Sequence, residues 1–180
     1  VPASHFIDAM MGHLGHPYYV GRLSAAEVHG YGHQRPQVFQ VITTAQLRDR
    51  SFGRVRIAFS TSRHAAERPA VDVNTPTGTM RVSTRETTVF DLVAHPNESG
   101  SLDNVATILG EMLDDAALDF QALAALADGD SERAYGSLRK AVAAFEEERR
   151  GTASLPAWGA PEAYLQLARR QLERGRRLRL

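Results

Sequence analysis

Two histidines separated by three residues are the first candidates for chemistry in this sequence. His29 and His33 have the spacing at which a helix presents two imidazoles to one zinc ion. Gly30 and Gly32 stand between them and disfavour the stable helix that such a pair requires. The position of the glutamate in an HExxH helix is also not acidic here. We therefore predict no metal site.

Glycine-rich and nucleophile motifs are the next candidates, and they are incomplete. Gly30 and Gly32 resemble a fragment of a dinucleotide loop, but the third glycine is missing and the segment runs from a helix to a strand, the reverse of the required order. The sequence has neither a GxxxxGK[ST] loop nor a serine in a GxSxG context. The carboxylates of Asp114, Asp115 and Asp119 are interpreted as a solvated helix face. We predict no catalytic and no cofactor-binding residues.

Composition limits the function classes further. The 180 residues are 43% hydrophobic and include no cysteine, so disulfides, thiolate zinc sites and cysteine nucleophiles are excluded. Twenty-one basic residues balance 21 acidic ones, so the whole chain has no net positive field for nucleic acid. No apolar run is long enough to span a bilayer, and no signal-peptide pattern is present. We expect a cytoplasmic protein without a membrane partner.

Charge is nevertheless distributed unevenly. Residues 91–130 contain acidic side chains and no Lys or Arg, whereas both flanking regions are more basic than acidic. The C-terminal arginines suit either contact with nucleic acid or an acidic partner, or a solvated chain end, and both alternatives stay open.

Helical periodicity marks the N-terminal part of the chain, which would position His29 and the glycines after it. Apolar spacing predicts a helix over residues 3–14 and a second over 18–28, where Ser24 and Glu27 fit a capping box and Gly30 ends the helix.

Between these helices and the C-terminal half, the apolar period changes to two. Alternation predicts strands over 38–44 and 53–62, with Val55, Ile57 and Phe59 on one face of the latter. Two shorter strands, 71–73 and 80–82, are joined by a turn with the sequence NTPTG.

Beyond the strands, the pattern is helical again. Ser83 and Glu86 fit a capping box for a helix that ends at Pro96, and Ser101 fits the cap of another helix. Residues from 117 to the end are predicted to be helical. The predicted fold is α+β, with a small mixed or antiparallel sheet flanked by N-terminal helices and a C-terminal helical segment.

Four sequence blocks together resemble one known family. They are YYVGRLSAAEVHG, HQRPQVFQV, GRVRIAF and NTPTGTMRVSTRETTVFDLV, and in this order they are similar to the C-terminal domain of AbiEi-type antitoxins. The resemblance covers about residues 2–115. It implies an AbiEi-like core at 1–115 followed by a helical extension at 116–180.

The resemblance implies a protein that neutralises a cognate nucleotidyltransferase-like toxin of a type IV abortive-infection system. Longer members carry an N-terminal winged helix that binds the operon's promoter. We expect no winged helix in this chain, so autoregulation through operator DNA would need a longer form or the basic ends. An enzyme that inactivates the toxin covalently, by kinase-like phosphorylation, stays open as the alternative.

The family pattern also selects residues. Its structural positions are Tyr18, Tyr19, Gly21, Ser24, Gly30, Pro36, Ser83, Glu86 and Asp91. The candidates for partner contact or for a polar network are His29, His33, Gln34, Gln37, Arg54, Arg56, Arg81 and Arg85. Histidine and glutamine suit a network and arginine suits contact, and neither alternative is excluded.

Overall fold

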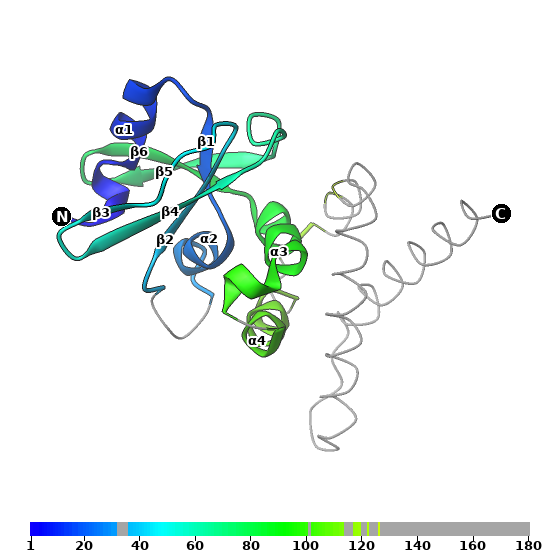
Figure 1. Ribbon diagram of the computed structural model, residues 1–180. Coiled ribbons are helices and arrows are strands. Elements are labelled where there is room, and N and C mark those ends of the chain that lie inside the picture. The colour runs from blue at the N-terminus through cyan, green and yellow to red at the C-terminus, as the bar shows by residue number, and fades with distance from the viewer. Residues whose placement is uncertain (32–35, 101, 114–116, 120–121, 123–125, 127–180) are drawn as a thin grey trace, which may run out of the picture. The chain divides into compact units, whose positions relative to one another are not determined.

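The structure is a computed structural model that describes residues 1–31, 36–100, 102–113, 117–119, 122 and 126 (Figure 1). The chain separates into two compact units, Val1–Thr88 and Val89–Leu180. Most of the helices predicted beyond residue 117 lie outside the described residues.

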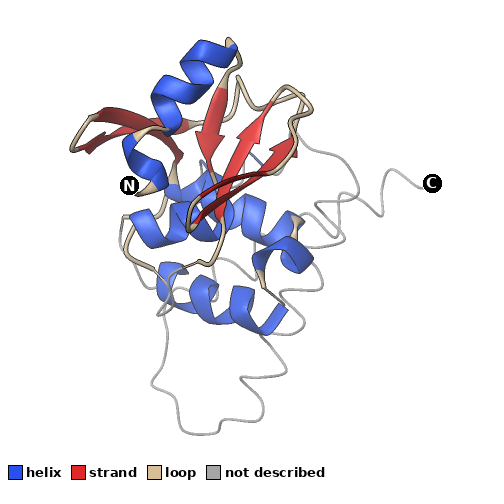
Figure 2. Ribbon diagram, turned by 60° about the vertical axis from the view of Figure 1, so that its left-hand side comes forward, coloured by secondary structure: helices blue, strands red, loops and turns tan. Residues whose placement is uncertain are grey.

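A mixed β-sheet forms the first unit (Figure 2). Its strands in the described part of the chain are β1 (Tyr18–Val20), β2 (Phe39–Thr43), β3 (Arg50–Phe52), β4 (Val55–Thr61), β5 (Ala70–Thr75) and β6 (Gly78–Ser83). They are ordered β3-β4-β2-β1-β6-β5. The pairs β1–β6 and β2–β4 are parallel, and the other neighbours are antiparallel. The predicted α+β fold with a mixed sheet is confirmed.

The helices have the following bounds. A 3-10 turn η1 (Ala3–His5) precedes α1 (Ile7–Leu14), and α2 (Arg22–Val28) follows β1. Next come α3 (Arg85–Ala94), the 3-10 turn η2 (Pro96–Ser99) and α4 (Leu102–Leu113). The predicted helix over 3–14 is therefore a turn followed by an α-helix, which ends at Gly15 with φ 71°.

The prediction of one helix over residues 18–28 is wrong in its first third. Residues Tyr18–Val20 form β1, a strand buried along its length between β2 and β6. The helix begins only at Arg22, and its N-cap is Gly21, so the predicted capping box does not form. The hydroxyl of Ser24 accepts the backbone N–H of Gln40 at 2.9 Å instead. Pairing of Tyr18–Val20 with β2 and β6 thus outweighs the helical spacing of the apolar residues, as tertiary context often does.

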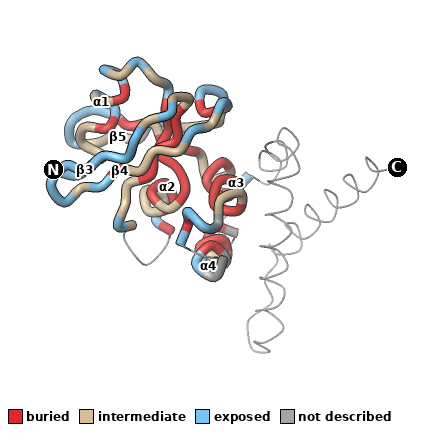
Figure 3. The backbone as a smooth tube through the Cα atoms, viewed as in Figure 1, coloured by how far each residue is buried: buried red, intermediate tan, exposed pale blue. Residues whose placement is uncertain are grey.

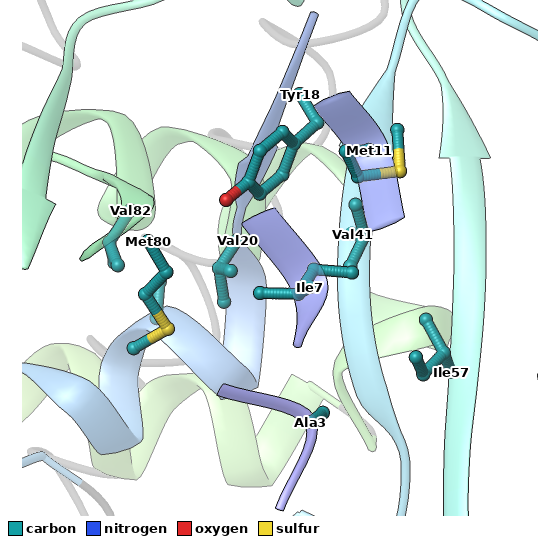
Figure 4. Close-up of a cluster of buried hydrophobic side chains, with 10 residues drawn as sticks. Ala3, Ile7, Met11, Tyr18, Val20, Val41, Ile57, Met80 and Val82 are labelled. Atoms are coloured by element: carbon teal, nitrogen blue, oxygen red, sulfur yellow. The ribbon is translucent and has the colours of Figure 1, made fainter. Parts of the chain in front are cut away.

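The main hydrophobic core lies on one face of the sheet (Figure 4). Helix α1 contributes Ile7 and Met11, both fully buried. The sheet residues of this cluster are Tyr18, Val20, Val41, Ile57, Met80 and Val82. The predicted apolar face of β4 is confirmed, since Val55 and Phe59 pack against this cluster beside Ile57. A smaller cluster of Tyr19, Ile42 and Ala65 lies apart from it.

Strand β3 was not predicted. Its three residues are exposed (Figure 3), and the stretch around them is too polar to show apolar alternation. Pairing with β4 supplies its backbone hydrogen bonds, so the strand forms although all three of its residues are classed as exposed.

The N-terminus of α3 is capped one residue later than predicted. The hydroxyl of Thr84, and not that of Ser83, accepts the backbone N–H of Thr87 at 3.2 Å. Ser83 is the last residue of β6, and its hydroxyl lies 2.8 Å from that of Thr88. The predicted Ser83–Glu86 capping box is therefore corrected to a Thr84 cap, because the strand continues through Ser83.

Substitution of this cap tests the assignment. Thr84→Ala is expected to lower the free energy of unfolding by about 1 kcal/mol, because one N–H of the first turn loses its acceptor. Urea unfolding followed by circular dichroism measures the change, with Thr84→Ser as the matched control that keeps the acceptor. Equal stabilities for the two variants would contradict the cap.

The second unit is described from Val89 through part of α4 and a few later residues. The residues Val105, Leu109 and Met112 are buried on one stripe of α4, and α4 is the helix that was predicted after Ser101. The hydroxyl of Ser99 donates to the carbonyl of His95 at 2.9 Å and so closes η2. The predicted cap Ser101 lies outside the described residues. No helix in the described ranges is long and apolar enough to cross a membrane.

Candidate functional site

The predicted polar candidates fall on separate elements of the first unit. Arg54 and Arg56 belong to the connection and second strand of the β3–β4 hairpin, whereas His29 and Arg85 lie near the start of α3. Gln37 is exposed just before β2. His33 and Gln34 lie outside the described residues.

The β3–β4 hairpin is closed by a two-residue turn, Gly53 and Arg54. Gly53 has φ 60°, and a positive φ at the first central position is what a type II′ hairpin turn requires. Ser51 pairs with Arg56, and Phe52 pairs with Val55. Since paired residues share a face and neighbours alternate, Arg56 and Phe52 point to opposite faces of the ribbon.

The hairpin is unusually rich in exposed cations. Arg48 and Arg50 precede the turn, Arg54 and Arg56 follow it, and all four are exposed. None of the four guanidinium groups forms a hydrogen bond or an ion pair with another described residue. We call Arg48, Arg50, Phe52, Arg54 and Arg56 the arginine hairpin.

Asp49 is the carboxylate within this stretch, and it has a structural partner. Its Oδ1 accepts the backbone N–H of Phe59 at 3.0 Å. The carboxylate thus accepts a backbone N–H of β4 that lies past the last residue pair of β3 and β4, Arg50 and Ile57. One negative charge among four positive ones leaves the hairpin strongly basic.

An aromatic ring lies close to the turn. Phe52 keeps 44% of its surface exposed. Its ring meets that of Phe6 edge-on, with 5.3 Å between the centroids and 73° between the planes, the arrangement that the ring quadrupoles favour. Phe6 itself packs against the main core. The exposed ring is therefore held in position by the fold.

A second group of predicted residues ties α2 to the connection between β6 and α3. The Nε2 of His29 donates to the carbonyl of Ser83 at 2.7 Å, which places the proton of the neutral ring on Nε2. The Nε of Arg85 donates to the hydroxyl of Tyr31, which is buried, at 3.1 Å. This geometry favours the polar-network alternative for His29 and Arg85.

The environment of His29 disfavours its charged form. Burial lowers the pKa of the imidazole, and the hydrogen bond to the Ser83 carbonyl opposes that effect. Among nearby charges, Arg85 lowers the pKa further and Glu86 raises it. The folded chain therefore binds a proton at His29 less readily than the unfolded chain, whose imidazole has a pKa of about 6.5.

This difference predicts an acid-sensitive contribution to stability. Below about pH 6.5 the unfolded chain takes up more protons at this position than the folded chain, so the free energy of unfolding falls until the pH passes the lowered folded pKa. Above that window the contribution is complete. His29→Gln, which keeps an N–H donor and cannot titrate, is expected to have a flatter stability profile between pH 8 and 5. Parallel profiles in urea unfolding would contradict the prediction.

Arg81 and Tyr18 are joined through the backbone. The Tyr18 hydroxyl donates to Oδ1 of Asp8 at 2.9 Å and accepts the backbone N–H of Arg81 at 3.2 Å. Burial raises the pKa of Tyr18, and the Asp8 carboxylate acts in the same direction. Arg81 is half-buried and is paired in the sheet register with Asp72. Tyr18 thus links α1 to β6.

The other residues predicted to be structural have the following places. Tyr19 is buried in β1, Gly21 is the N-cap of α2, and Gly30 has φ 90° after the helix. Pro36 is half-buried before β2, Glu86 lies in the first turn of α3, and Asp91 is buried within α3. Their structural roles stay a prediction.

Two polar side chains, those of Arg22 and of Gln40 in β2, make contacts at the β1–α2 junction that were not predicted. Arg22 is 4% exposed and has φ 54°, a left-handed conformation that is costly for a residue with a Cβ. Its Nη1 donates to the hydroxyl of Ser60 on β4 at 2.7 Å. The side-chain oxygen of Gln40 accepts the backbone N–H of Leu23 at 3.0 Å. The sequence offered no signal for these contacts, since they depend on β1 being a strand.

The described residues contain no group of three or more His, Cys, Asp or Glu side chains arranged to hold a metal ion. Asp114 and Asp115 lie outside the described ranges. What the arrangement offers is a basic surface with an aromatic centre at the arginine hairpin, and a hydrogen-bonded junction at His29 and Arg85.

The sequence model of one protein family, described as the AbiEi antitoxin C-terminal domain, matches residues 19–143. The match covers more than half of the chain and spans β1 to α4, including the arginine hairpin. No curated protein matches the chain.

Proposed function

Since the chain belongs to the AbiEi antitoxin C-terminal domain family, we propose that it neutralises a cognate nucleotidyltransferase-like toxin by binding to it directly. The family supports the antitoxin role, and the kind of toxin and the mode of neutralisation are the proposal. Within this proposal, residues 1–115 are the antitoxin core and residues 116–180 are an extension that follows it. Action in the cytoplasm fits a sequence without cysteine.

The observation that carries direct binding is the arginine hairpin. Four exposed guanidinium groups make no hydrogen bond or ion pair within the described part of the chain, and an aromatic ring lies among them. Arginine and aromatic residues are enriched in protein–protein interfaces, where they supply most of the binding energy.

Co-expression tests the antitoxin proposal. The nucleotidyltransferase-like protein encoded beside this chain is produced in bacteria from an inducible promoter, with and without the full chain. We expect growth arrest by the toxin alone and recovery when both are present, and co-purification of the two proteins. Continued arrest at equal protein levels would overturn the proposal.

Covalent inactivation is the alternative, because guanidinium groups also hold phosphate through charge-assisted hydrogen bonds. Incubating the two purified proteins with ATP and Mg²⁺ and weighing the intact toxin separates the two mechanisms. Direct binding predicts an unchanged toxin mass together with a stable complex. A phosphorylated toxin that stays inactive after the chain is removed would favour the alternative.

Autoregulation of its own operon is a further part of the proposal. In this arrangement, operator DNA is bound through a winged helix in a longer form of the protein or through basic ends. A steep fall of DNA affinity with salt is expected for such phosphate contacts.

A further inference from the structure

We propose that the free edge of β5 binds β5 of a second copy of this chain in antiparallel orientation, so that the two sheets continue into each other across a two-fold axis. β5 is the last strand in the order of the sheet, and β6 is the one described strand that pairs with it. None of its six residues is buried (Figure 3). The inference concerns self-association and does not depend on the proposed function.

Alternate residues of β5 direct their backbone N–H and C=O groups toward this free edge. Thr75 pairs with Gly78 across the two-residue turn that joins β5 to β6, so these two residues exchange both backbone hydrogen bonds. Hydrogen-bonded pairs alternate along an antiparallel ladder, and the backbone groups of Asp72 and Asn74 therefore point away from β6. These groups form no other backbone hydrogen bond within the described part of the chain.

The backbone of Arg81 shows the same alternation on the neighbouring strand. Arg81 is paired with Asp72, and its N–H donates to the hydroxyl of Tyr18 in β1 at 3.2 Å, on the side away from β5. The two members of this pair thus point their backbone groups away from each other. Donors and acceptors that lie at an exposed edge are the groups that a further strand satisfies.

The two edges of the sheet differ in how they are protected against a second copy. β3 is three residues long and lies within the arginine hairpin, so two β3 edges repel each other. β5 has no Pro and one charged residue, Asp72, and its register with β6 runs without a bulge from Ala70 to Thr75. Charged side chains, Pro and bulges are the features that prevent edge pairing. Of the two edges, β5 is the one that a second copy fits.

Asp72 selects the register of the pair. A register that places Asp72 opposite its own copy brings two carboxylates together, which is unfavourable. In the register centred on Val73, Asp72 lies opposite Asn74 of the second copy, whose side-chain amide donates to the carboxylate. The outward-facing backbone groups of these two residues also satisfy each other. The same register brings the two Val73 side chains together and places Val71, which is 44% exposed, opposite Thr75.

The small size of the contact sets its strength. Pro69 and Pro76 flank β5, and a prolyl residue has no N–H to donate, so the pairing extends over residues 71–75 of each copy. Such a contact is smaller than a stable interface, and we expect a dimer Kd of about 10–100 µM. The two-fold arrangement uses both β5 edges and therefore stops at a dimer.

The decisive experiment is sedimentation velocity of the full chain at concentrations from about 1 to 300 µM, which bracket the expected Kd. We expect the wild type to change from monomer to dimer over this range. Asn74→Asp places a carboxylate opposite Asp72 on both sides of the axis and is expected to raise Kd about 10-fold. The double variant Asp72→Asn/Asn74→Asp exchanges the two side chains, restores the pairing and is expected to stay within about 2-fold of the wild type.

Gln46→Glu is the matched control, because it makes the same change in charge at an exposed position outside β5. Its Kd is expected to stay within about 2-fold of the wild type. Circular dichroism and urea unfolding verify that each variant folds like the wild type.

A disulfide tests the register directly, since the chain has no cysteine of its own. In the proposed register the two copies of Val73 form a pair without backbone hydrogen bonds, whose Cα atoms lie about 4.5 Å apart, within the range of disulfides. Val73→Cys is therefore expected to give a covalent dimer on mild oxidation, seen on a non-reducing gel. Val71→Cys, which lies opposite Thr75, is expected to give much less.

The outcomes decide between a second copy and other occupants of the edge. A wild type that stays monomeric over the whole range overturns the inference, and so does a species larger than a dimer. A dimer whose Kd is unchanged in Asn74→Asp, or is not restored in the double variant, also overturns it. A monomeric wild type whose binding to the neighbouring nucleotidyltransferase-like protein is weakened by Asn74→Asp overturns the inference and assigns the edge to a strand of the toxin. Co-expression tests the antitoxin role separately from all of these results.

Discussion

Replacing Tyr19 with alanine is expected to lower the free energy of unfolding by about 3–5 kcal/mol, the range for removing a large buried aromatic side chain. Tyr19 is 1% exposed in β1, with strands on both sides, and packs in a cluster with Ile42 and Ala65. Truncation leaves a cavity that the paired strands cannot close without losing their register. Because small domains have a total stability of about 5–15 kcal/mol, this one change removes a large share of it.

Urea unfolding monitored by circular dichroism measures the effect, and two variants serve as controls. Tyr19→Phe keeps the ring and removes the hydroxyl, so its cost is expected to be about 1 kcal/mol. Val71→Ala changes a side chain that is 44% exposed on β5 and is expected to cost less than about 1 kcal/mol. A cost for Tyr19→Ala no larger than that for Val71→Ala would argue against a buried central β1.

The same strand marks the limit of what the sequence predicted. The strands β2, β4, β5 and β6 were found because their apolar residues alternate, and the turn before Gly78 was recognisable from its Pro and Gly. By contrast, β1 is three residues long and buried on both faces, so it has no alternation to detect. Strand β3 is exposed and depends on its pairing with β4. Pairing partners are a property of the whole fold and cannot be read from three residues.

The candidate site was predicted in part for the same reason. Arg54 and Arg56 were identified as contact candidates, but Arg50 and Phe52 were not, because they join the same surface only when β3 pairs with β4. The family resemblance selected His29 and Arg85, while their hydrogen bonds to Ser83 and Tyr31 required the fold. Arg22 was not identified, since its burial depends on the β1–α2 junction.

The second large effect is expected at the base of the arginine hairpin. Ile57 is 1% exposed, and its backbone is paired with Phe39 of β2 on one side and Arg50 of β3 on the other. Ile57→Ala is expected to lower the free energy of unfolding by about 2–5 kcal/mol, because it opens a cavity in the main core beneath two strand pairs. Ile57→Val, which removes one methylene, is expected to cost about 0.5–1.5 kcal/mol and is the matched control.

This substitution also separates stability from recognition. Ile57 faces the core, so its substitution by alanine changes none of the side chains of the arginine hairpin. The folded fraction of Ile57→Ala is therefore expected to bind the toxin with nearly wild-type Kd at low temperature. Arg56→Glu should behave in the opposite way, with wild-type unfolding and weakened binding, since its side chain is exposed. Comparing the urea midpoint and the Kd of both variants therefore tests whether core and contact surface are distinct within one strand. A large loss of affinity in Ile57→Ala without a loss of stability would show that they are not.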